Sequence, residues 1–208
     1  MRTRTKAMAL ALCAVLLVAS TVFVTMAFLT DSESVQNTFT VGKVGITLDE
    51  AKVKPDGIIE AGADRASTAG RVKENAYHLI PGHKYVKDPT IHVDSDSETC
   101  WLFVKLENGL QAIIASKTIE EQMQEKGWTV IDATKNIWAY AATADAGANV
   151  PVFDEFTLKG EANVASYATT KDADGNVTAG PVIKVTAYAV QADGFATAIE
   201  AWTATFGK

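Results

Sequence analysis

The sequence VIKVTAYAVQ, residues 182–191, decides the fold of this chain. Successive side chains of a strand point to opposite faces, so alternate residues of this stretch share a face. One face would carry Ile183, Val185, Ala187 and Ala189, and the other Val182, Lys184, Thr186, Tyr188 and Val190. Both faces are largely apolar, which is typical of a strand that is covered on two sides.

A second stretch, CWLFVKLE at residues 100–107, has the same character. Both of its faces are apolar at first and one becomes polar, which predicts a central strand of a sandwich that runs outward. Further strand candidates, rich in β-branched and aromatic residues, are 35–48, 90–95, 128–131, 137–141 and 150–158. Residues 51–75 lack a sustained period and predict a long surface loop. Asp174-Gly175-Asn176 predicts a hairpin turn that leads to 182–191.

Two short helices complete the pattern. Residues 118–126 begin with a capping box of Thr118 and Glu121, and Gly127 ends the helix. Near the C-terminus, one helical face would carry Phe195, Ile199, Trp202 and Phe206. Many short strands with two small helices predict a mainly β, antiparallel β-sandwich.

The first 30 residues indicate export. Three cations at positions 2, 4 and 6 precede an uncharged apolar run from residue 7 to residue 29. Thr25-Met26-Ala27 then supplies small residues at positions −3 and −1 of a cleavage site, as in a secretory signal peptide. We therefore expect cleavage between Ala27 and Phe28, with a signal peptide at 1–27 and one domain at 28–208. An uncleaved membrane anchor is the alternative, and it would also place the domain outside the cytoplasm.

Charge and cysteine content limit the partners. The segment 1–27 holds three of the 19 basic residues and no acidic ones, which leaves 16 basic against 25 acidic residues. This acidic balance opposes binding to nucleic acid or to anionic lipid, so membrane contact is expected only through the signal segment. Cys100 is the one cysteine outside that segment, and its strand position favours a small buried apolar residue over an intermolecular disulfide.

Candidate metal ligands are few. The chain has three histidines, His78, His83 and His92, and none lies in a His-Glu-x-x-His motif. His92, Asp94 and Asp96 would share one face if the strand at 90–95 continued, although the serines between them favour a solvated acidic loop. We expect no catalytic residue and no cofactor, with these five side chains as weak metal candidates.

Several segments of this sequence resemble segments of the TasA/camelysin family, whose members are proteins exported by Gram-positive bacteria. They are Ala27-Phe28-Leu29-Thr30-Asp31, NTFTVGKVGITLDE at 37–50, NAYHLIPGHKYVKDPTIHV at 75–93, ETCWLFVKLEN at 98–108 and AYAVQADGF at 187–195. They follow one another in family order. The stretches 51–75 and 141–149 match no pattern of the family, which leaves surface properties and partners open.

The resemblance implies a jelly-roll-like β-sandwich and cleavage between Ala27 and Phe28 by a signal peptidase of the SipW type. It implies a secreted protein of the extracellular matrix or cell surface, the major fibre subunit of a biofilm matrix. Its partners would be further copies of itself and an accessory matrix or anchoring protein. In this family the N-terminal strand of one subunit completes the sheet of the next. The matching donor would begin at Phe28 and run towards Thr40.

The residues are compatible with strand donation. An extended segment at a free N-terminus can pair with an open sheet edge. Its groove-facing side chains would be Val35, Asn37, Phe39 and Val41, with Phe39 as the anchor. Three alternatives stay open: pairing of 35–48 within its own domain, a camelysin-type metallopeptidase, and a monomeric cell-surface binding module.

Overall fold

The computed structural model describes residues 3, 6–17, 42–60, 70–167, 170–171 and 177–207. The chain divides into two units, Met1–Val41 and Gly42–Lys208. In the first unit, residues 6–17 are helical. Among the residues within these ranges, no helix combines the length and the apolar character needed to cross a membrane. The predicted cleavage site at Ala27 and Phe28 and the predicted donor residues 28–41 lie outside the described ranges.

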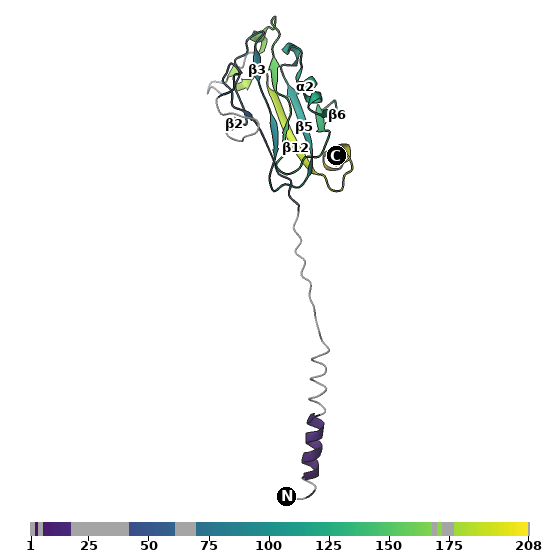
Figure 1. Ribbon diagram of the computed structural model, residues 1–208. Helices are drawn as coiled ribbons and strands as arrows, with labels where there is room; N and C mark the ends of the chain where they lie inside the picture. The colour runs from purple at the N-terminus through teal and green to yellow at the C-terminus, as the bar shows by residue number, and fades with distance from the viewer. Residues whose placement is uncertain are drawn as a thin grey trace. The chain divides into compact units, whose positions relative to one another are not determined.

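The second unit is mainly β and antiparallel (Figure 1). One four-stranded sheet has the order β2(Arg71–Val72), β1(Ile46–Ala51), β4(Thr90–Val93), β8(Asn149–Pro151). The other has the order β12(Ile183–Gln191), β5(Cys100–Asn108), β7(Ile137–Tyr140), β6(Trp128–Asp132). Two smaller pairs join β3(Lys84–Val86) to β9(Glu155–Thr157) and β10(Thr170–Lys171) to β11(Val177–Ala179).

The two strands that dominate the sequence pattern form the longest pair. β12 and β5 are matched over their whole length, from Ile183 opposite Asn108 to Gln191 opposite Cys100. The side chains of the first predicted face of β12 pack against the main core, and Tyr188 and Val190 belong to a second cluster on the opposite face. The prediction of two covered faces is therefore confirmed.

The main core lies between the two four-stranded sheets. It includes Ile91 and Val93 from β4 and Leu102 and Val104 from β5, all at most 4% exposed. Complete burial of one such side chain contributes about 1.5–3 kcal/mol. Cys100 is fully buried in this core, as predicted, and burial raises the pKa of its thiol, with a smaller contribution from the charge of Asp145. The facing sheets make the unit a β-sandwich.

The two predicted helices are present. α2(Ile119–Glu125) has the predicted capping box, and Ile119 and Met123 are fully buried. α3(Ala198–Phe206) covers the outer side of the β12-β5-β7-β6 sheet, with Trp202 against Phe103 and Tyr188. The predicted apolar helical face is wrong at Ile199, which is 61% exposed. Phe206 at the end of this face is 36% exposed, although its ring contacts Tyr188 and Trp202. Ala201 is buried in place of Ile199, because a small side chain allows the helix to approach the sheet closely. The remaining short helices are η1(Gln111–Ile113) and η2(Val164–Tyr167).

The cap of α2 gives a first prediction. The Thr118 hydroxyl accepts a hydrogen bond from the Glu121 N–H at 3.2 Å, and the Glu121 carboxylate accepts one from the Thr118 N–H at 2.7 Å. Thr118→Ala should lower the free energy of unfolding by about 1 kcal/mol, because the first turn loses an acceptor. Urea denaturation measures this change. Thr118→Ser keeps the hydroxyl and is the matched control; an equal loss in both variants would contradict the assignment.

Four strand and loop predictions need correction. Residues 35–41 of the strand predicted at 35–48 lie outside the described ranges; from Gly42 onward, the strand begins at Ile46 and continues to Ala51, three residues beyond the predicted end. The strand predicted at 150–158 is two strands, β8 and β9, because Pro151 has no N–H to continue the ladder.

The predicted loop at 51–75 holds β2, whose Arg71 side chain is completely buried. The Asp174-Gly175-Asn176 turn lies outside the described residues. The strands on either side of it, β10 and β11, pair antiparallel as the predicted hairpin requires, but the strand that follows the turn is β11 and not β12.

Candidate functional site

The three histidines lie in different surroundings. His78 is exposed, and its carbonyl accepts a hydrogen bond from the Tyr85 hydroxyl at 2.7 Å. The His83 ring lies 2.7 Å from the Asp56 carbonyl oxygen. His92 is buried on β4, with one ring nitrogen 2.9 Å from Asp49 Oδ1. Among the residues that the structure describes, no three His, Cys, Asp or Glu side chains form a group that could hold a metal ion.

The acidic residues that follow His92 do not continue its strand. β4 ends at Val93, and the Asp94 carbonyl accepts a hydrogen bond from the Ser97 N–H in a turn. Asp96 forms an exposed ion pair with Lys43 at 2.8 Å. The hydrogen bond from Lys43, together with its charge, holds the pKa of Asp96 below its usual range. The shared face on which the weak metal prediction for His92, Asp94 and Asp96 depended is therefore not formed.

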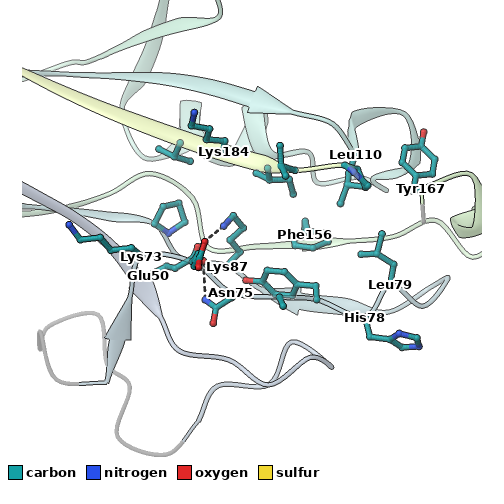
Figure 2. Close-up of a pocket in the computed structure, with 18 of the residues that line it drawn as sticks. Glu50, Lys73, Asn75, His78, Leu79, Lys87, Leu110, Phe156, Tyr167 and Lys184 are labelled. Atoms are coloured by element: carbon teal, nitrogen blue, oxygen red, sulfur yellow. Dashed lines mark hydrogen bonds and ion pairs between the residues drawn. The ribbon is translucent and has the colours of Figure 1, made fainter. Parts of the chain in front are cut away.

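A candidate site is a groove between the two sheets, with a volume of about 1030 Å³ (Figure 2). We call it the β1–β12 groove. It takes Leu48, Asp49 and Glu50 from β1 and Ile183, Lys184 and Val185 from β12. Apolar side chains from other elements complete it, among them Leu79, Leu110, Phe156, Val164 and Tyr167.

Strand edges line the groove on both sides. β12 is the outermost strand of its sheet and pairs with β5 alone among the strands that the structure describes. β1 pairs with β2 only at Glu50 and Ala51, so its outer edge from Ile46 to Asp49 has no strand partner within the described ranges. Unpaired edges present backbone N–H and C=O groups that can pair with a further strand.

A buried polar group lies in the wall of the groove, and we call it the Glu50 trio. The Glu50 carboxylate accepts hydrogen bonds from Lys87 Nζ at 2.5 Å and from Asn75 Nδ2 at 2.9 Å. The side chains of Glu50 and Lys87 are 5% and 11% exposed. Burial raises the pKa of the neighbouring Tyr77, and the charges of Glu50 and Asp88 raise it further. Figure 2 shows the trio at the end of the groove near Lys73 and Lys184, away from Leu79 and Leu110.

A second ionic cluster holds the strands on the outer side of the same sheet. The Arg71 guanidinium donates to Asp49 Oδ1 at 2.5 Å and to Asp88 Oδ2 at 3.1 Å. Burial opposes the charge of Arg71, but the hydrogen bonds and charges of these carboxylates outweigh it and raise its pKa. The Asp88 side chain also accepts from the Ala51 N–H at 2.7 Å. The cluster thereby ties β1 and β2 to the segment that precedes β4.

The groove and the start of the described domain lie at opposite ends of β12. A Cβ at Gly42 would lie 3.4 Å from the side chain of Gln191, the last residue of β12. The groove instead contains Ile183, the first residue of that strand. Eight residues of extended chain separate the two positions, which is about 26 Å.

Sequence reasoning missed the polar residues of this site. Glu50 could have been found, because it continues the alternation of Ile46 and Leu48 on the inner face of β1. Arg71 and Asn75 gave no signal, because the stretch around them lacks a period and their partners lie far away in the sequence. No protein-family model, curated protein or solved structure matches this chain. The family resemblance therefore rests on the sequence segments themselves.

Proposed function

We propose that this protein is a secreted structural subunit that assembles into extracellular matrix fibres. In this proposal a signal peptidase of the SipW type removes residues 1–27, and the freed segment 28–41 of one copy binds in the β1–β12 groove of the next. The observation that carries the proposal is the apolar groove beside the edge of β12, which has no strand partner among the described residues, and beside the part of the β1 edge that precedes its pairing with β2.

The groove has the features that strand addition requires. The edge of β12 offers backbone hydrogen bonds over up to nine residues, and the groove offers apolar contacts for alternate side chains of an added strand. In the donor segment 28–41, the apolar side chains of Val35, Phe39 and Val41 would make these contacts. An open, apolar edge is otherwise an aggregation hazard, which proteins usually cover.

The positions of donor and acceptor favour a fibre over a closed dimer. The chain enters the described domain at Gly42, beside the end of β12, and the groove lies at the beginning of that strand. A contact between two different surfaces of the same subunit repeats head to tail and grows into a filament when its rotation does not close a ring. The jelly-roll connectivity, the extracellular location and an accessory anchoring protein belong to the same proposal, on the strength of the family resemblance.

Two forms of the protein test the proposal. The chain that begins at Phe28 should sediment as a polymer and form filaments in electron micrographs. The chain that begins at Gly42 keeps every strand described in this unit, so it should stay monomeric with the same circular dichroism. Because this shorter chain retains the groove, it should also stop filament growth when added in small amounts.

Two results would contradict the proposal. A chain beginning at Phe28 that stays monomeric at every concentration and salt level would show that the segment pairs within its own domain. Filaments from the chain beginning at Gly42 would show that another surface drives assembly.

A further inference from the structure

We propose that the Glu50 trio fixes the register of the incoming strand by pairing with Asn37 of the neighbouring copy. This inference rests on the proposed function and adds to it the chemistry by which the groove recognises one alignment. Its occupant is the segment 28–41 of a second copy.

The acceptor side is a balanced ion pair with unused hydrogen-bonding capacity. An ammonium group has three N–H donors, and a carboxylate has about four lone-pair sites. The contacts within the trio use one donor of Lys87 and two sites of Glu50. Both side chains are nearly buried, and both line the groove. Of the other charged lining residues, Lys73, Glu74 and Lys184 are exposed, so water can satisfy them. The nearly buried Asp49 already accepts from Arg71 and lies 2.9 Å from a His92 ring nitrogen. The trio is thus the place in the groove where an apolar strand would leave buried polar groups without partners.

The donor side has one neutral matching residue. Among the groove-facing residues Val35, Asn37, Phe39 and Val41, Asn37 alone is polar; Asp31 and Glu33 share this face nearer the N-terminus, but either would bring a second carboxylate next to Glu50. The Asn37 amide carries both an acceptor oxygen and two N–H donors. It can accept from Lys87 and donate to Glu50, and because it is neutral, the balance between the two charges is kept.

A shift of the donor strand along the groove would be unfavourable at two places. The side-chain period of a strand is two residues, so the nearest alignment with the same face inward moves the strand by two. That slip places Val35 or Phe39 against the trio and moves Asn37 into the apolar part of the groove. Buried polar groups would then lack partners at both places. A single buried asparagine specifies alignment in coiled coils by the same effect.

The test uses full chains that begin at Phe28. Asn37→Val should raise the concentration needed for filament growth by about tenfold or more, because the trio is buried without a partner. Thr38→Val makes the same kind of change on the opposite face and should leave that concentration within about twofold of the wild type. Equal effects of the two variants, or no effect of Asn37→Val, would overturn the inference.

A compensating variant separates recognition from general damage. Glu50→Leu with Lys87→Met removes the ion pair, a replacement that proteins often tolerate. Combined with Asn37→Val it should restore growth to within about threefold of the wild type, whereas alone it should impair growth, because Asn37 then faces apolar side chains. Failure of the combination to recover in a folded protein would overturn the inference.

A direct measurement needs no substitution. In fibres grown from a mixture of ¹⁵N-labelled and ¹³C-labelled chains, solid-state NMR should show a contact between the Asn37 amide and the Glu50 carboxylate. Contacts of the trio with Val35 or Phe39 instead would overturn the inference while leaving strand donation intact. If chains beginning at Phe28 form no fibres at all, the proposed function itself has failed.

Discussion

Exchange of Arg71 for methionine is expected to lower the free energy of unfolding by about 3–5 kcal/mol at pH 7. The Arg71 side chain is completely buried and donates to Asp49 and Asp88, whose side chains are 11% and 6% exposed. Methionine fills a similar volume but leaves two poorly solvated carboxylates without this cation. Urea denaturation at pH 7 measures the loss.

An exposed ion pair provides the comparison that identifies the cause. Removal of a buried cation leaves poorly solvated carboxylates uncompensated, whereas removal of an exposed cation leaves its partner in water. Lys43→Met is the matched control, because Lys43 also forms an ion pair, with Asp96, but at an exposed position. Exposed pairs are screened by water and salt, so this variant should unfold with the wild-type midpoint. A loss for Arg71→Met no larger than the loss for Lys43→Met would mean that the buried cation does not stabilise the fold.

The second large effect concerns assembly. In a chain that begins at Phe28, Phe39→Asp should raise the concentration needed for filament growth by about 100-fold. In the proposed register Phe39 lies one side-chain repeat from the Glu50 trio, in a groove with Leu110, Phe156 and Ile183 in its lining. A carboxylate desolvated there without a partner costs several kcal/mol, and each 1.4 kcal/mol is a factor of about ten.

Thr40→Asp is the control for this variant. It adds the same charge one residue away, on the face that alternation directs out of the groove. Its growth should differ from that of the wild type by less than about threefold, and light scattering over a dilution series measures both. If Phe39→Asp grows like the wild type, the anchor is another residue and the proposed inward face is wrong.

The local structure was largely predictable from the sequence. The alternation in 182–191 and 100–107 predicted the two longest strands with their correct faces. The capping box gave α2, because its hydrogen bonds join residues only three apart. These predictions succeeded because each depends on side chains close together in the chain.

The predictions were wrong where residues distant in the sequence determine whether a side chain is buried. Ile199 has the spacing of a buried helical residue, yet it is exposed, because the sheet beneath α3 accommodates Ala201 more closely. Residues 51–75 have the composition of a loop, yet Arg71 is buried, because Asp88 lies 17 positions further along and meets it from another part of the sheet.

The sequence by itself determined that the chain builds antiparallel strands with apolar faces, since alternation is a property of neighbouring residues. Only the tertiary structure decided that β1 and β12 lie at the same side of the sandwich, with an apolar groove and a buried ion pair between them. The position of two strands more than 130 residues apart on facing sheets depends on the free energy of the whole core, and no local pattern encodes it.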